Sequence, residues 1–227
     1  MNENQENNVA EEVKQESDLK QETVKTFNEA KEKMKNINLK EEAEVGKGLL
    51  KKLWKNPVDT IKEIANDKEN KAFKTALLLA AVWAIIELVT MVLYYATSKY
   101  AEFEFLPTLK ATVAPILKVI AMTLAVYFVN NRAKDSISKL LTSVTIAYIP
   151  SIISSLLWIL YEISSKISTI LTPVGGLLNV VSIVLMYNTV KAITNEEDET
   201  KAIKIFIKVE VVYYVIVLAV SFLGISL

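Results

Sequence analysis

Long apolar stretches separated by short charged loops make up the last two-thirds of the chain. Each stretch is long enough to cross a hydrocarbon core, which takes about 20 helical residues. Soluble proteins do not carry five such stretches in succession, so the pattern predicts an all-α, polytopic membrane protein with a five-helix transmembrane bundle. The predicted spans cover residues 72–97, 111–130, 140–161, 169–193 and 205–225, within a membrane domain of residues 72–227.

The polar N-terminal part has a different pattern. Residues 1–44 are predicted to form a cytoplasmic arm that is partly disordered and partly helical, because its first 17 residues carry too few apolar side chains to fold. Residues 19–39 carry a sparse apolar stripe at helical spacing, which predicts either a solvated amphipathic helix or one that binds a partner protein. The stripe consists of Val24, Phe27, Ala30, Met34 and Ile37.

A basic amphipathic segment, residues 45–71, connects the arm to the first span. Leucine and tryptophan side chains lie beside lysines there, as is typical of a helix at the headgroup boundary. Each lysine near anionic lipid would contribute about 1 kcal/mol to membrane binding. Leu53 and Trp54 are expected to face lipid, and Asn56 with Pro57 to start a second short helix. The alternative is an ordinary pair of cytoplasmic helices. The predicted membrane-surface residues are Lys47, Lys51, Lys52, Trp54 and Lys55.

The positive charges predict the orientation. Lysines and the single arginine, Arg132, concentrate before span one, after span two and after span four, all on the same side of the membrane. Basic loops face the cytoplasm, so we expect the N-terminus inside and the C-terminus outside a cell membrane. The start of the chain lacks a signal peptide pattern, and the first span is expected to direct insertion. Abundant Lys, Asn and Ile suggest a bacterial source.

The composition excludes several kinds of chemistry. The chain has 0 cysteines, 0 histidines and 5 glycines, and its formal net charge is +0. Thiol nucleophiles, histidine catalysis and Cys/His metal sites are therefore absent, and little glycine is available for phosphate-binding loops. We expect no enzyme activity, no metal, no cofactor and no nucleic-acid partner. The lipid bilayer, with anionic lipids, is the expected partner. The sequence leaves the oligomeric state open.

The first two predicted spans each carry a charged residue far from their ends, where charges are costly unless they are paired or solvated. Glu87 and Lys118 lie at similar depths in spans one and two. Antiparallel neighbours would bring them level, so we predict an intramembrane ion pair. This pair could clamp the two spans or take part in transport, and the alternative is a Lys118 side chain that extends to the outer surface.

The third span carries both a packing motif and a kink signal. Ser143, Ala147, Ser151 and Ser155 recur at every fourth residue, a spacing that lets helices approach closely, either within one chain or between two copies. Proline inside a span kinks the helix. The predicted kink residues are Tyr148, Pro150 and, in the fourth span, Pro173.

Two segments are similar to the Yip1 family of small polytopic membrane proteins. The first is WKNPVDTIKEI at residues 54–64, and the second is SKLLTSVTIAYIPSIISSLL at residues 138–157, with Tyr148-Ile149-Pro150 near its centre. The resemblance covers residues 53–227. It implies a cytosolic N-terminal arm, five spans, and a non-enzymatic protein that organises membranes or partner proteins.

The sequence leads to three hypotheses about function. The first hypothesis is a scaffold of the Yip1 type, held on the inner leaflet by its basic segment and binding protein partners through the arm. The second is a small transporter or permease subunit that uses Glu87 and Lys118. The third is an accessory subunit of a membrane complex. A polar cavity containing Glu87, Lys118, Tyr148 or Asn179 would favour transport, whereas a dry bundle would favour the scaffold.

Overall fold

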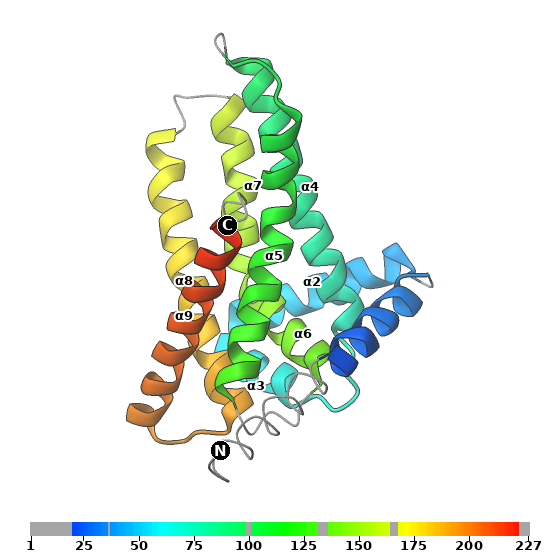
Figure 1. The fold of residues 1–227 in the computed structure, drawn as a ribbon, viewed down its shortest axis with the longest axis vertical. Coiled ribbons are helices and arrows are strands. Elements are labelled where there is room, and N and C mark those ends of the chain that lie inside the picture. Colours follow the sequence, from blue (N-terminus) through cyan, green and yellow to red (C-terminus); the bar gives the residue numbers. More distant parts are fainter. Residues whose placement is uncertain (1–19, 36, 99–100, 131–135, 164–167, 223–227) are drawn as a thin grey trace, which may run out of the picture.

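The computed structural model describes residues 20–35, 37–98, 101–130, 136–163 and 168–222. Every regular element in these ranges is a helix, and no strand occurs among them. The predicted disorder of the first 17 residues falls outside the described ranges. The all-α prediction is confirmed, and Figure 1 shows long helices running side by side with shorter helices at one end.

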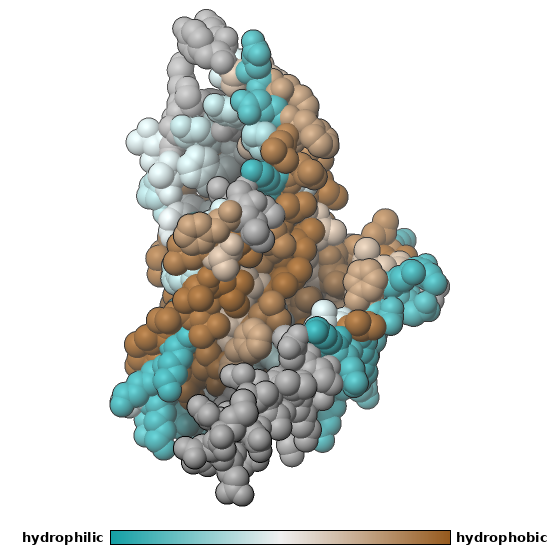
Figure 2. Space-filling model, viewed as in Figure 1, coloured by the Kyte–Doolittle hydropathy of each residue, from teal (hydrophilic) through white to brown (hydrophobic). Residues whose placement is uncertain are grey.

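The long helices correspond to the predicted spans. Four of them are long and apolar enough to cross a membrane, and a bent helix pair makes a fifth span if it is counted as one. The four are α4 (Phe73–Thr97), α5 (Phe105–Val129), α8 (Ser168–Thr194) and α9 (Glu199–Phe222). The pair is α6 (Ile137–Ala147) and α7 (Ile149–Ile163), bent by 48°. Figure 2 shows an apolar surface over the spans and hydrophilic surface toward the two ends.

The break in the third span lies at Tyr148, between α6 and α7. Pro150 is the second residue of α7, where it has no N–H to donate and its ring excludes the carbonyl of Ile146 from a regular helical position. The predicted kink therefore occurs, and it is large enough to separate two helices. Pro173 behaves differently, because α8 continues through it from Ser168 to Thr194.

The core centres on α6, whose residues from Thr142 to Ala147 are all buried. Leu140 and Ile146 are completely enclosed, as are Phe73 at the start of α4 and Val126 near the end of α5. The helix α6 packs against α3, α4, α5 and α8. This placement makes the first half of the third span the centre of the bundle.

Two short helices precede the spans and pack against them. They are α2 (Leu39–Lys55) and α3 (Pro57–Asn66). The helix α3 buries Ile61 and Ala65 against α6 and α8, while α2 packs on α3 and α4. Leu53 is only 8% exposed, so the expectation that it faces lipid is wrong. Its side chain points to the bundle because it shares a face with Leu49, one turn earlier.

The helix α2 begins at Leu39, six residues before the predicted basic segment of residues 45–71. Asn38 explains the early start, because its side-chain oxygen accepts hydrogen bonds from the Lys40 and Glu41 amides. A separate N-terminal helix, residues 20–35, precedes this cap. It contacts the bundle where the Lys33 ammonium lies 4.8 Å from the centre of the Phe73 ring.

A glycine permits the close approach of α7 and α8. A Cβ atom added at Gly175 would lie 2.9 Å from Oγ of the buried Ser154, whereas one at Gly176 would meet nothing within 4 Å. Alanine favours a helix equally at both positions. We therefore expect Gly175→Ala to be less stable than Gly176→Ala by about 1 kcal/mol, measured by denaturant unfolding in mixed micelles. Equal stability of the two variants would contradict this packing.

Candidate functional site: a polar pocket at α8 and α9

A pocket of about 400 Å³ lies inside the membrane domain. It is formed by residues from α5, the α6–α7 break, α7, α8 and α9, which are five separate parts of the chain. Four of its lining residues are apolar: Met122, Ile183, Met186 and Phe206. The other seven are polar: Tyr148, Ser151, Asn179, Ser182, Glu210, Tyr213 and Tyr214. A pocket with this many polar groups is unusual in a bundle surrounded by lipid.

Glu210 supplies the charge of the pocket. It is half-buried and lies near the middle of α9, five residues inside the apolar stretch that starts at Ile205. That is about 7 Å along the helix axis. No described residue donates a hydrogen bond or forms an ion pair with its carboxylate. Tyr213 and Tyr214 follow it by three and four residues, so all three side chains lie on one face of α9.

Tyr148 connects the pocket to the rest of the bundle. Its side chain lines the pocket together with Glu210 and Tyr213 of α9. Its ring also packs against Trp83 of α4, with 5.5 Å between ring centres. The break at Pro150 places Tyr148 at this position, because Tyr148 is the residue between α6 and α7.

Ser182 of α8 caps the start of α7. Its Oγ accepts hydrogen bonds from the Ser151 amide at 3.0 Å and from the Ser151 hydroxyl at 2.9 Å. The Ser151 amide is in the first turn of α7, where helical N–H groups have no partner inside the helix. A side chain from a neighbouring helix therefore satisfies an N–H group that the break in the third span leaves open.

Side chains beyond the pocket hold α8 and α9 together at the Glu199 end of α9. The Glu199 carboxylate accepts hydrogen bonds from the Tyr187 hydroxyl and the Lys191 ammonium of α8. The Tyr187 ring also packs edge-on against Phe206, with 5.6 Å between ring centres. These contacts fix one end of the helix pair, and the pocket lies farther along both helices.

The predicted ion pair of Glu87 and Lys118 is not formed between these two described residues. The Glu87 carboxylate accepts hydrogen bonds from the Ser155 hydroxyl at 2.8 Å and from the Trp83 indole at 3.2 Å. It therefore faces α7 and not α5. Lys118 is half-buried and lies one turn before Met122, a residue that lines the pocket, on the same helix.

The predicted packing row is divided between the buried core and bonds to two neighbouring helices, α8 and α4. Ser143 and Ala147 are buried in the core on α6. Ser151 bonds to Ser182 of α8, and Ser155 bonds to Glu87 of α4. The change of direction at Tyr148 explains why a single row on the sequence meets different neighbours. These described contacts place the row in packing within one chain.

The predicted membrane-surface residues lie on α2. Trp54 is 89% exposed, and its four lysine neighbours are exposed as well. Lys52 forms an ion pair with Glu63 of α3, with 2.8 Å between its Nζ and the carboxylate. The other three are Lys47, Lys51 and Lys55. Trp54 is thus available to lipid, whereas Lys52 connects the two short helices.

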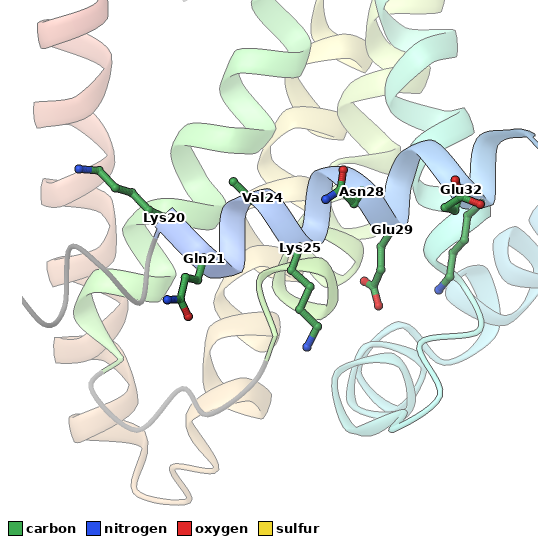
Figure 3. Close-up of a pocket in the computed structure, with 8 residues that line it drawn as sticks. Lys20, Gln21, Val24, Lys25, Asn28, Glu29 and Glu32 are labelled. Carbon is green, nitrogen blue, oxygen red and sulfur yellow. The ribbon is translucent and has the colours of Figure 1, made fainter.

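A second hollow lies along the N-terminal helix (Figure 3). All the residues that line it belong to this one helix, including Lys20, Val24 and Glu32. Their side chains extend along the helix without converging on a common point, as the close-up shows. The hollow is therefore an open surface, whereas the pocket at α8 and α9 is enclosed by several helices. Among the described residues, no group of three or more Asp, Glu, His or Cys side chains could hold a metal ion.

Of the polar residues that line the pocket, the sequence pointed to Tyr148, Ser151 and Asn179, whereas Glu210, Ser182 and Tyr213 were not predicted as site residues. A signal for the pocket was present, since Glu210, Tyr213 and Tyr214 have the spacing of one helical face inside an apolar stretch. Their position near the end of the span is also typical of interfacial anchors. The pattern alone therefore did not distinguish an anchor from a pocket.

Comparison with known families agrees with this architecture. The Yip1 domain matches residues 51–222, from the last turns of α2 to the end of α9. No curated protein and no solved structure matches the chain. The family match covers well over half of the chain and includes both segments, residues 54–64 and 138–157, that suggested it. The chain therefore belongs to the Yip1 family and is a multi-pass membrane protein.

Proposed function

We propose that this protein is a non-enzymatic membrane organiser, which anchors its N-terminal part on the inner leaflet of a cell membrane and presents it to partner proteins. The observation that carries the proposal is the outer face of α2. Leu49 and Leu53 turn toward the bundle, yet Leu39, Leu50 and Trp54 remain exposed on another face of the same helix. A helix with a second apolar face and flanking lysines suits a lipid headgroup region.

The direction of α2 supports this proposal. The helix runs across the long axis of the spans and not along it (Figure 1). The Thr75 hydroxyl donates a hydrogen bond to the Glu42 carboxylate at 2.8 Å, which fixes α2 against the beginning of α4. A helix fixed at the entry to a span and lying across it is placed to rest on a bilayer surface. The lysine bias assigns this surface to the cytoplasmic side, with the C-terminus outside.

A second candidate, a small transporter or permease subunit, is favoured by the polar pocket. The pocket contains Tyr148 and Asn179, two residues whose presence in a cavity favours transport. The route would differ from the predicted one, because neither Glu87 nor Lys118 lines this pocket. We rank this candidate second because the pocket alone does not make a path between the two sides of the membrane.

The absence of cysteine allows a direct test of the α2 surface. A single spin label can be attached to Trp54→Cys, and a matched control label to Gly48→Cys, which lies on the same helix about 120° around its axis in open space. In nanodiscs with anionic lipid, we expect the label at position 54 to collide with oxygen more often than with a water-soluble nickel chelate, and the label at position 48 to show the reverse.

The lysines provide the second arm of this test. Changing Lys47, Lys51 and Lys55 to glutamine is expected to move the label at position 54 toward water, because about 1 kcal/mol of lipid attraction is lost for each lysine. Labels at positions 54 and 48 that are equally accessible to water in anionic nanodiscs would contradict the proposed anchoring.

A further inference from the structure

The pocket at α8 and α9 has an approach from the lipid side. Its lining residues Asn179 and Ile183 of α8 are exposed, and Tyr214 of α9 is 61% exposed. Side chains that line a pocket and also reach the outer surface mark its rim. In the membrane this rim faces lipid, because the surrounding surface of α8 and α9 consists of exposed apolar side chains such as Val180 and Val215.

The pocket contains a carboxylate that is not neutralised by a described residue. A charge placed below the surface of a membrane is costly, so such groups are usually paired or hydrogen-bonded. Glu210 has neither kind of described partner. Lys208 is exposed and lies two residues from Glu210, on another side of α9. Lys118 lies on α5, one turn before the lining residue Met122. Neither lysine lines the pocket.

The other lining groups suit an organic cation. Three tyrosine rings and Phe206 line the same pocket as the carboxylate, and the faces of aromatic rings attract ammonium groups. The hydroxyl and amide oxygens of Ser151, Ser182 and Asn179 can accept hydrogen bonds from N–H groups. A volume of about 400 Å³ accommodates a small headgroup with part of its chain and exceeds what a bare metal ion would need.

We propose that this pocket binds the ammonium group of an amphiphile, which enters from the bilayer between α8 and α9 and pairs with Glu210. Two sources share this chemistry: the headgroup of an aminophospholipid, and a free lipophilic amine. The aromatic rings surround the ammonium, while the apolar side chains Ile183 and Met186 contact the chain of the ligand. The inference concerns the pocket alone and does not depend on the role proposed for α2.

The test measures binding to the full-length protein in nanodiscs made of phosphatidylcholine. The probes are octylammonium, a short-chain phosphatidylethanolamine and, as controls, octanol and a short-chain phosphatidylglycerol. We expect saturable binding of at least one ammonium probe, and at least tenfold weaker binding of both controls. Binding of phosphatidylethanolamine identifies a headgroup site, and binding of octylammonium alone identifies a site for free amines. Octanol that binds as tightly as octylammonium would overturn the proposal.

Two variants assign the binding to this pocket. Glu210→Gln keeps the shape of the side chain and is expected to weaken ammonium binding at least tenfold, whereas Glu197→Gln, an exposed carboxylate in the loop before α9, is expected to leave it unchanged. Ile183→Trp keeps Glu210 but narrows the rim, and it is also expected to weaken binding. If Glu210→Gln does not fold, Ile183→Trp decides the question. Unchanged affinity in the folded variants would overturn the proposal.

Discussion

Replacing Ser182 with alanine is expected to lower the free energy of unfolding by about 2 kcal/mol. The Ser182 hydroxyl accepts hydrogen bonds from both the amide and the hydroxyl of Ser151. Pro150 has already removed one N–H group from the first turn of α7, and the Ser151 amide is the next one in the chain. Without Ser182 this amide loses its acceptor at membrane depth, where lipid offers none. Denaturant unfolding in bicelles measures the change.

A matched control isolates the role of this cap. Ser221 also lies on an apolar helix, but its hydroxyl donates to the Val217 carbonyl of its own helix and its side chain is exposed. Ser221→Ala is therefore expected to change stability by less than about 0.5 kcal/mol. Ser182→Thr keeps the oxygen and should retain most of the stability. If Ser182→Ala and Ser221→Ala are equally stable, α7 does not depend on the cap from α8.

The fold could be predicted because span length and apolar composition are local properties of the chain. Each predicted span lies within a few residues of its helix or helix pair, except that α5 and α9 begin six residues earlier than expected, at Phe105 and Glu199. These extra turns are polar or aromatic segments outside the apolar stretches. Hydropathy finds the part of a helix inside the membrane and not the part that extends into the headgroup region.

The partners of Glu87 could not be predicted in the same way. Counting residues along two antiparallel helices gives an approximate depth for each side chain, and this count placed Glu87 and Lys118 at similar depths. It does not give the rotation of each helix about its axis, which depends on packing against all neighbours. The helix α4 packs on α5, α6 and α7, and its rotation directs Glu87 toward Ser155 of α7.

The pocket depends on contacts that no local pattern contains. Tyr148, Ser182 and Glu210 come from three separate spans, and the break at Pro150 brings the first of them toward the other two. The sequence predicted the break at Pro150 and named Tyr148, but it did not single out Ser182 or Glu210 as site residues. Their meeting requires α8 and α9 to lie next to each other, and the bonds from Tyr187 and Lys191 to Glu199 help to fix that arrangement.

Removing the Glu87 carboxylate is expected to lower the free energy of unfolding by about 2 kcal/mol, because hydrogen bonds to a charged acceptor are stronger than neutral ones. Glu87→Ala leaves the Ser155 hydroxyl without its acceptor in α4 and removes one hydrogen bond between α4 and α7. Trp83 keeps its bond to Ser155 at 2.9 Å, which limits the loss. Glu87→Gln retains a carbonyl oxygen and is expected to lose only about 1 kcal/mol.

Lys118 is the decisive control for this prediction, because an ion pair and the observed triad of Trp83, Glu87 and Ser155 give different double-mutant cycles. In the triad, Lys118→Ala has a small effect that adds to that of Glu87→Ala within about 0.5 kcal/mol. In an ion pair, Lys118→Ala would recover part of the stability lost in Glu87→Ala, since it would remove an uncompensated charge. Ser155→Ala should instead show strong coupling to Glu87→Ala. If Lys118→Ala recovers stability and Ser155→Ala shows no coupling to Glu87→Ala, the carboxylate faces α5. If Ser155→Ala shows strong coupling and Lys118→Ala recovers nothing, Glu87 links the first span to the second half of the third.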